Sequence, residues 1–449
     1  MHFNSGDTAW ILASSALVLF MTPGLAFFYG GMVRSKNVLG MLMQNYVVIG
    51  IVSLIWVFLT YSLSFGVDWG GFGLIGTLHF FGLAHMNQAV PGYTGASAQT
   101  IPPMVFVVFQ MMFAIITPAL ITGSTADRLR FGPFVAFIVL WSIIVYAPVA
   151  HWVFSPTGWL FKLGAEDFAG GTVVHINAGA AGLAVAMVVG KRRGWPKQAM
   201  PPHNVPFVLL GAGILWFGWF GFNAGSALGA NVLAANAFVN TNTATAAALL
   251  GWILVEKLKN GKSTTLGAAS GAVAGLVAIT PACGFVDIYG ATAIGLAAGV
   301  ICALAINLKF KVGLDDALDV GGVHLVGGIT GALLIGIFGT SAIGGANGLF
   351  YGGGAKLLGH QLIAVVVVGL YSFTISWIMA KLIDNLVGFR IKADEELEGM
   401  DTALHAESAY EFGGSTLRTL LGSGSLGESI RVTTEEAPMV LPRKSREIS

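Results

Sequence analysis

Eleven apolar stretches, each about as long as a membrane-spanning helix, dominate the first 388 residues of the chain. A helix needs about 20 apolar residues to cross the hydrocarbon core of a bilayer. The first ten stretches contain no Asp, Glu, Lys or Arg. The stretches lie near 9–31, 39–65, 102–124, 131–150, 168–190, 205–228, 233–255, 264–282, 288–308, 321–340 and 360–388. Because a soluble core has no room for so many apolar residues, we predict an all-α membrane protein with eleven transmembrane helices embedded in a lipid bilayer.

Basic residues predict the orientation of these helices, because cytoplasmic loops are enriched in Lys and Arg. The loops after odd-numbered stretches, together with the C-terminal tail, hold 20 basic residues, and the opposite loops hold 2. The N-terminus is therefore predicted to lie outside and the C-terminus in the cytoplasm, in a multi-pass protein of the plasma or inner membrane. The start of the chain has no basic n-region, so we interpret the first stretch as a permanent helix, with a cleaved signal peptide as the alternative.

Composition divides the chain into three regions. Residues 1–388 form the predicted transmembrane domain. Residues 389–412 mix charged and apolar positions and are predicted to be an ordered cytoplasmic segment. Residues 413–449 are rich in Gly and Ser with scattered charge, which predicts a flexible cytoplasmic extension.

Two segments that lie five stretches apart share a sequence pattern: DFAGGTVVHINAGAAGL at 167–183 and DVGGVHLVGGITGAL at 319–333. Each reads Asp, a Gly-Gly pair, His, and then Gly four and seven residues after the His. Five helices per half predict an inverted 5+5 repeat with an eleventh helix added, and such repeats place the transport path at their interface. The glycines should let the two helices cross closely, bringing His175 and His324 within hydrogen-bonding reach.

A histidine on an apolar helix face is often structural, but two in matched repeat positions favour a function, because polar groups in a membrane are costly. Desolvation favours neutral imidazoles, and two of them sharing a hydrogen bond offer both a donor and an acceptor. This chemistry suits a small molecule that has N–H groups and a lone pair, or a proton passed between rings.

Aromatic residues near these histidines are candidates for attracting a cation. Phe109 and Phe113 lie four apart on one helix face, while Trp219, Phe222 and Ser226 follow spacings of three and four. Aromatic faces attract a partly desolvated cation by about 0.5–2 kcal/mol each, and a hydroxyl supplies an acceptor. Simple packing is the alternative interpretation of this stripe.

Asp167, at the start of the fifth stretch, is predicted to be primarily an N-cap and secondarily a source of negative potential for a cation. Neither G-x-S-x-G nor HExxH occurs, so no catalytic residue and no enzyme activity are predicted. The two cysteines lie in apolar stretches and the net charge is +1. We therefore expect no metal, no cofactor and no nucleic-acid partner.

The motifs together resemble the Amt/Mep/Rh ammonium transporters, and most closely the prokaryotic Amt type. The similarity extends from about Thr8 to Tyr410. It rests on FYGGMVRSKN (28–37), ADRLRFG (126–132), DFAGGTVVHINAG, GWFGFNAGSA, TPACG (280–284), the GVH around His324, and GMDTALHAESAY (399–410).

The resemblance implies roles for particular residues. The implied outer ammonium site comprises Phe113, Phe154, Trp219, Ser226 and Asp167. The implied gate comprises Phe109, Phe113 and Phe222, with Phe109 and Phe113 as its stacked pair. The implied pore is lined by the twin histidines His175 and His324. Phe154 stands where many Amt proteins have Trp, a stronger cation–π partner, which predicts a weaker outer site.

The implied function is ammonium transport: ammonium is recruited outside, deprotonated at the gate, and conducted as ammonia through a hydrophobic pore. The proton either follows through the histidines, giving electrogenic uptake, or stays behind. The resemblance also implies a homotrimer and a PII-type regulatory protein on the cytoplasmic face. Alternatives are an ammonium sensor with little or no transport, a channel for urea or water, and a membrane-embedded enzyme.

Overall fold

Helices form every regular element in residues 2–93 and 99–410, which are the residues that the computed structural model describes. The isolated backbone bridges among these residues build no strand. The extension predicted to be flexible, 413–449, lies outside the described residues. The all-α prediction is therefore confirmed for the described part of the chain.

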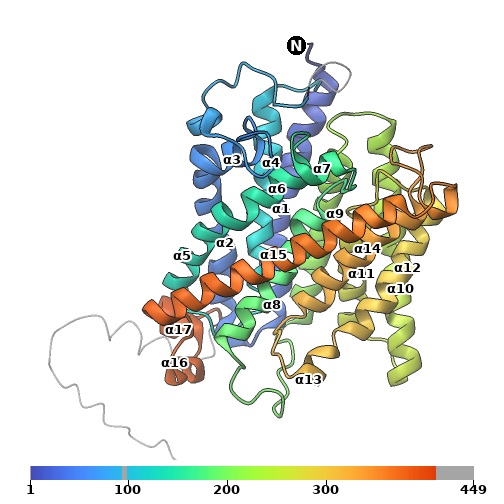
Figure 1. The fold of residues 1–449 in the computed structure, drawn as a ribbon. Coiled ribbons are helices and arrows are strands. Elements are labelled where there is room, and N and C mark those ends of the chain that lie inside the picture. The colour runs from blue at the N-terminus through green and yellow to red at the C-terminus, as the bar shows by residue number, and fades with distance from the viewer. Residues whose placement is uncertain (1, 94–98, 411–449) are drawn as a thin grey trace, which may run out of the picture. The chain divides into compact units, whose positions relative to one another are not determined.

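The first half of the chain forms five long helical stretches, some of them interrupted by a π-helical turn (Figure 1). Its elements are α1 (Ser5–Met32), η1 (Ser35–Asn37), α2 (Val38–Ile55), η2 (Trp56–Thr60), α3 (Tyr61–Phe65), η3 (Leu78–Leu83), α4 (Pro103–Ile121), α5 (Phe131–Trp141), η5 (Ser142–Tyr146), α6 (Ala147–Phe154), α7 (Trp159–Leu163), η6 (Gly171–Ile176) and α8 (Asn177–Val189).

The second half contributes five further long stretches, and Figure 1 shows α15 crossing the other helices obliquely. Its elements are α9 (Val205–Gly225), α10 (Val232–Asn260), α11 (Thr265–Ile279), α12 (Ile288–Ala305), α13 (Leu308–Val312), η7 (Gly321–Leu325), α14 (Val326–Phe338), η8 (Leu349–Tyr351), α15 (Lys356–Val387), α16 (Ala393–Glu398) and α17 (Met400–His405). Ten helical stretches of the described residues are long and apolar enough to cross a membrane.

The eighth predicted stretch differs from the others, because its helix α11 is short. α11 has 15 residues, so it is about 22 Å long, against a hydrocarbon core of about 30 Å. The helix ends at Ile279 because Pro281 has no N–H group to extend the hydrogen-bond ladder. Most of its residues are buried, packed between α10, α12, α9 and α14.

The two segments that echo each other in the sequence cross in the middle of the molecule, as the glycine pattern predicts. A Cβ atom on Gly179 would lie 2.5 Å from the backbone nitrogen of Leu325. A Cβ atom on Gly328 would lie 2.9 Å from the carbonyl oxygen of Gly171. These two positions therefore need glycine, because any side chain would push the two backbones apart.

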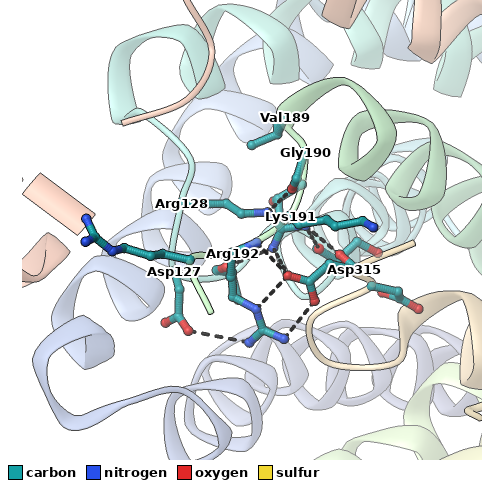
Figure 2. A network of polar contacts seen from close by, with 12 residues as sticks. Asp127, Arg128, Val189, Gly190, Lys191, Arg192 and Asp315 are labelled. Atoms are coloured by element: carbon teal, nitrogen blue, oxygen red, sulfur yellow. Dashed lines mark hydrogen bonds and ion pairs between the residues drawn. The ribbon is translucent and has the colours of Figure 1, made fainter. Parts of the chain in front are cut away.

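The basic loops meet at one end of the helices and are tied together by buried ion pairs (Figure 2). The Arg192 guanidinium contacts Asp315 Oδ1 at 2.8 Å and Asp127 Oδ2 at 3.5 Å. Arg128 is fully buried and donates to several backbone carbonyls, including that of Asp315 at 2.5 Å. Loops that were predicted to share one side of the membrane thus lie in contact.

The segment after α15 folds back onto these loops. Glu396 Oε1 accepts a hydrogen bond from the backbone N–H of Arg193 at 2.7 Å, and Glu396 Oε2 pairs with Arg390 at 2.7 Å. Asp401 Oδ1 accepts from the backbone N–H of Gly40 at 2.8 Å. The carboxylates of α16 and α17 therefore hold this segment against the basic end of the helices.

Candidate functional site

Three cavities follow one another through the middle of the helices. The aromatic cavity, of about 460 Å³, ends at Phe113. The central cavity, of about 10 Å³, is lined by Phe222, His175 and His324. The loop-side cavity, of about 100 Å³, lies toward the basic loops and also reaches His324. The three cavities are adjacent, because Phe113 of the first contacts Phe222 of the second and His324 lines both the second and the third. We refer to this series of cavities as the path.

Four residues of the expected outer site line the aromatic cavity: Phe113, Phe154, Ser226 and Asp167. The rings of Phe113 and Phe154 meet edge to face with centroids 6.2 Å apart. Ser226 Oγ donates to the carbonyl oxygen of Phe222 at 2.8 Å, so its lone pairs remain as acceptors. Helices α4 and α6 thus bring aromatic rings to this cavity, the end of α9 brings a hydroxyl, and the segment before η6 brings a carboxylate.

Among the rings that line the three cavities, the closest contact pairs Phe113 with Phe222, whose ring centroids are 4.3 Å apart with planes tilted by 38°. The expectation that Phe109 and Phe113 form the stacked pair is wrong. Those rings meet edge to face, at 5.0 Å and 71°, because both project from neighbouring turns of α4. The facing ring comes instead from α9, on the opposite wall. Phe109 is fully buried behind Phe113.

Trp219 lies deeper than expected for an outer-site residue. It lines the central cavity and is not among the residues around the aromatic cavity. Its ring stacks on that of His175 with centroids 5.4 Å apart, and its Nε1 donates to Thr280 Oγ1 at 2.7 Å. Trp219 precedes Phe222 by about one turn of α9, which places it on the histidine side of the Phe113–Phe222 contact.

The two histidines lie in contact at the centre of the path. Their Nδ1 atoms are 3.3 Å apart, and the imidazoles are almost completely buried. Such a contact is a hydrogen bond when one ring donates and the other accepts, which two neutral tautomers satisfy. His175 Nε2 is also buried and has no hydrogen-bond partner among the described residues. The pair therefore offers an unused ring nitrogen to a small guest.

Asp167 caps the segment that leads to His175, as the sequence predicts. Its carboxylate accepts four backbone hydrogen bonds at 2.7–3.2 Å, from residues 170 to 173. In the second segment the cap is Asp316, which accepts from Val320 at 3.2 Å and Gly321 at 2.7 Å.

The repeat pattern therefore needs a correction at its first residue. The sequence comparison paired Asp167 with Asp319, but the capping residue of the second copy is Asp316. Equal spacing is the signal that identifies it, because each capping Asp precedes its histidine by eight residues. Asp319 corresponds instead to Gly170, and both residues have positive φ, at 62° and 114°.

Sequence reasoning missed one carboxyl group of the aromatic cavity, that of Glu166. Glu166 Oε1 accepts from the backbone N–H of Ala346 at 2.6 Å, while Oε2 is buried without a partner among the described residues. Burial raises the pKa of Glu166 to about 7. Its position directly before Asp167, at the mouth of an apolar stretch, is the signal that could have found it.

No group of three or more His, Cys, Asp or Glu side chains within residues 2–93 and 99–410 is arranged to hold a metal ion. Cys283 and Cys302 are free and buried in that part of the chain.

Comparison with known proteins identifies the family of this architecture. The profile described as Ammonium Transporter Family matches residues 9–410. An ammonium transporter of Mycobacterium tuberculosis is 52% identical over 460 residues, covering 97% of this chain and 94% of the relative. The crystal structure of Saccharomyces cerevisiae Mep2 matches with a TM-score of 0.80 and 37% identity, covering 87% of this chain and 91% of that one.

A solved structure described as "Sensor Amt Protein" is similar as well, with a TM-score of 0.81 and 30% identity over 89% of this chain and 98% of that chain. The sequence matches and the ten membrane-length helices make the protein a multi-pass membrane protein. The chain belongs to the ammonium transporter family.

Proposed function

We propose that the chain takes ammonium into the aromatic cavity, deprotonates it at the Phe113–Phe222 contact, and conducts ammonia past His175 and His324. One observation carries the proposal: a pair of buried imidazoles in contact occupies a constriction of about 10 Å³ between two larger cavities. A space of that size has no room for a hydrated ion.

The constriction disfavours any permanent cation. Moving an ion from water into an apolar interior costs several kcal/mol even after relaxation. Ammonium avoids this cost because it can release a proton and continue as a neutral molecule. Before that step, aromatic faces and the lone pairs of Ser226 stabilise the partly desolvated cation, and the nearby Asp167 carboxylate adds negative potential.

The histidines serve both products of the deprotonation. In the neutral tautomer of His175 that leaves Nε2 unprotonated, this buried nitrogen accepts a hydrogen bond from an N–H of ammonia. The hydrogen bond satisfies a polar atom that otherwise has no partner among the described residues. The proton crosses from ring to ring through the contact between the Nδ1 atoms, which is 3.3 Å long. Transport is then electrogenic, because each ammonia is followed by one proton.

The membrane arrangement is part of the same proposal. The aromatic cavity faces outside and the basic loops face the cytoplasm, with α11 as the short eighth of eleven spans and the two capped segments as the cores of an inverted 5+5 repeat. The equal spacing from each capping Asp to its histidine supports the repeat, and the contacts among basic loops support the orientation. The same proposal includes a homotrimer that meets a PII-type protein at its cytoplasmic face.

Reconstituted vesicles test the mechanism. An ammonium pulse should evoke a current without internal alkalinisation in the wild type, because a proton accompanies each ammonia, and His175→Ala should reduce the current at least tenfold. His175→Asp and His324→Glu should admit potassium, because a carboxylate stabilises a permanent cation that two neutral rings do not. The exposed His2 supplies a matched control, since His2→Ala should retain the wild-type current.

Absence of any current while ammonia still crosses the wild-type membrane would refute electrogenic transport but leave ammonia conduction intact. Unchanged potassium exclusion in both carboxylate variants would remove the histidines from the selectivity filter. Growth of a transporter-deficient host on limiting ammonium separates transport from a purely sensory role, because a sensor with a closed path would not restore growth.

A further inference from the structure

Asp319 has a backbone conformation that glycine would adopt more easily. Its φ is +62°, and the corresponding residue of the other capped segment is Gly170, with φ of +114°. A non-glycine residue in this region is uncommon, although Asp and Asn tolerate it better than other side chains. An Asp in a strained conformation, at a position where the other segment has glycine, indicates a functional role for the carboxylate.

The side chain of Asp319 lines the loop-side cavity, which also exposes His324. Asp319 Oδ1 lies 2.6 Å from Lys309 Nζ, and 30% of the Asp319 side chain is exposed. Lys309 Nζ also donates to the backbone carbonyl of Asp316 at 3.1 Å, which fixes the ammonium group beside the carboxylate. A cavity of about 100 Å³ has room for a few water molecules between the carboxylate and the imidazole.

The surroundings of Asp319 make its carboxylate easier to protonate than an exposed one. Burial raises the pKa of Asp319 to about 6; Asp316 adds to this shift, while Lys309 and Arg192 oppose it. The other carboxylate of the cavity, Glu256, is occupied by hydrogen bonds from the backbone N–H of Thr264 at 2.8 Å and from its hydroxyl at 3.1 Å. Asp319 is thus the better placed of these two carboxylates to take a proton from His324.

We propose that Asp319 is the proton acceptor at the cytoplasmic exit of the path. The inference rests on the proposed electrogenic function and names the group that receives the relayed proton. His324 gives one ring proton, through water in the cavity, to the Asp319 carboxylate, and takes the next proton from His175. The resulting carboxylic acid then protonates an emerging ammonia, which regenerates the carboxylate and releases one ammonium ion. One ammonium enters and one leaves, so atoms and charge balance.

Lys309 is a positioning residue in this scheme. Its ammonium group compensates the carboxylate charge at rest, so that Asp319 does not retain the departing ammonium ion. When Asp319 is protonated, the ion pair weakens and the carboxyl group is free to reorient within the cavity. Lys309→Met should therefore slow release of ammonium rather than uptake, seen as a current that rises normally but decays more slowly.

Substitution by glycine separates chemistry from backbone strain. Asp319→Gly removes the carboxylate and relieves the positive φ, and Asp319→Asn keeps the shape and removes the charge. Both variants should fold and show a thermal midpoint at or near that of the wild type, yet give ammonium-evoked currents reduced at least tenfold in vesicles. Asp319→Glu should retain a larger current than either. Asp394→Asn, a change at an exposed carboxylate of α16, should keep the full current.

The outcomes distinguish this proposal from the proposed function. Wild-type currents that vanish in His175→Ala but persist in Asp319→Gly would overturn the role of Asp319 and leave the histidine relay standing. A wild type that conducts ammonia without current would instead remove the relay on which both depend. Lowering the internal pH below about 6 should suppress the wild-type current, because Asp319 is then already protonated. The same change should not alter the residual current of Asp319→Gly.

Discussion

The two capped segments that meet at the histidine pair share a backbone design and differ in charge. Asp167 and Asp316 each cap a π-helical turn, eight residues before one histidine of the pair. Three residues after each cap the chain has positive φ, at Gly170 in one segment and Asp319 in the other. One cap opens on a cavity of about 460 Å³, and the other segment borders a cavity of about 100 Å³.

The difference follows from the opposite tasks that we propose for the two ends. The end that recruits a cation from water combines aromatic rings with the Glu166 and Asp167 carboxylates. The end that releases it pairs its carboxylate with a cation, as Asp319 does with Lys309, and lies beside the ion pair of Arg192 with Asp315. We therefore infer that the same backbone arrangement serves recruitment at one end and release at the other. The two ends differ in whether a basic side chain is paired with the carboxylate.

The caps should give the largest difference between the segments. Asp167→Ala leaves four backbone N–H groups without an acceptor, and Asp316→Ala leaves two. At about 1–3 kcal/mol for each buried unsatisfied group, the first loss is comparable with the 5–15 kcal/mol that stabilises a typical protein. We expect Asp167→Ala to yield no folded protein in detergent, and Asp316→Ala to fold with a thermal midpoint lowered by several degrees.

Thermal unfolding followed by intrinsic fluorescence, with size-exclusion chromatography, measures both effects. Asp167→Asn provides the control, because its amide oxygen still accepts two of the four hydrogen bonds. Asp167→Asn should therefore still fold in detergent, with a midpoint below that of the wild type. Equal midpoints for the two alanine variants would show that the number of capped N–H groups does not set the difference between the segments.

The sequence predicts the frame better than the contacts between helices. Ten of eleven apolar stretches became membrane-length helices, because length and lack of charge alone define such a span. The close crossing of the capped segments was predictable too, since Gly179 and Gly328 follow a visible pattern. α11 is shorter than its predicted stretch because Pro281 prevents the helix from extending beyond Ile279.

Residues facing each other across the path were harder to assign. Phe109 and Phe113 share a face of α4, which suggested a stack, but the partner of Phe113 is Phe222 from α9. Spacing along one helix says nothing about what the opposite helix presents. Spacing likewise did not indicate that Trp219 lines the central cavity, and the repeat pattern paired Asp167 with Asp319, whereas Asp316 makes the equivalent capping hydrogen bonds.

Acidity should separate the carboxyl groups at the two ends. Burial raises the pKa of Glu166 from 4.5 to about 7 and that of Asp319 from 3.8 to about 6. An acid with a raised folded-state pKa binds more protons when folded than when unfolded. The contribution of Glu166 is therefore complete below about pH 4.5 and is lost as the pH rises through 7.

We expect wild-type stability to decrease by about 1–2 kcal/mol between pH 5 and pH 7.5 through Glu166, after allowance for its partial exposure. Thermal midpoints across this range measure the slope. Glu166→Gln should flatten it between pH 6 and pH 7.5, whereas Asp319→Asn should flatten the more acidic part. A wild-type slope that survives unchanged in Glu166→Gln would show that this carboxyl group is not the one that titrates.

The smallest effect concerns one ring of the aromatic cavity. Phe154 packs edge-on to Phe113, with centroids 6.2 Å apart, where a larger indole would present a stronger cation–π surface to ammonium. Phe154→Trp should gain about 0.5–1 kcal/mol of cation binding, which is about a two- to fivefold lower KM for the ammonium-evoked current.

The maximal current of Phe154→Trp should stay near the wild-type value, because the new contact stabilises bound ammonium and not the neutral species in the constriction. Phe161→Trp adds an indole to the same cavity at an exposed position and should leave KM unchanged. A lower KM in both variants would assign the gain to the apolar surface of the cavity as a whole. A change confined to Phe154→Trp would locate cation recruitment at the rings beside Phe113. These rings belong to the aromatic cavity, and the comparison with the loop-side cavity at Asp319 would then rest on recruitment by aromatic rings at one end only.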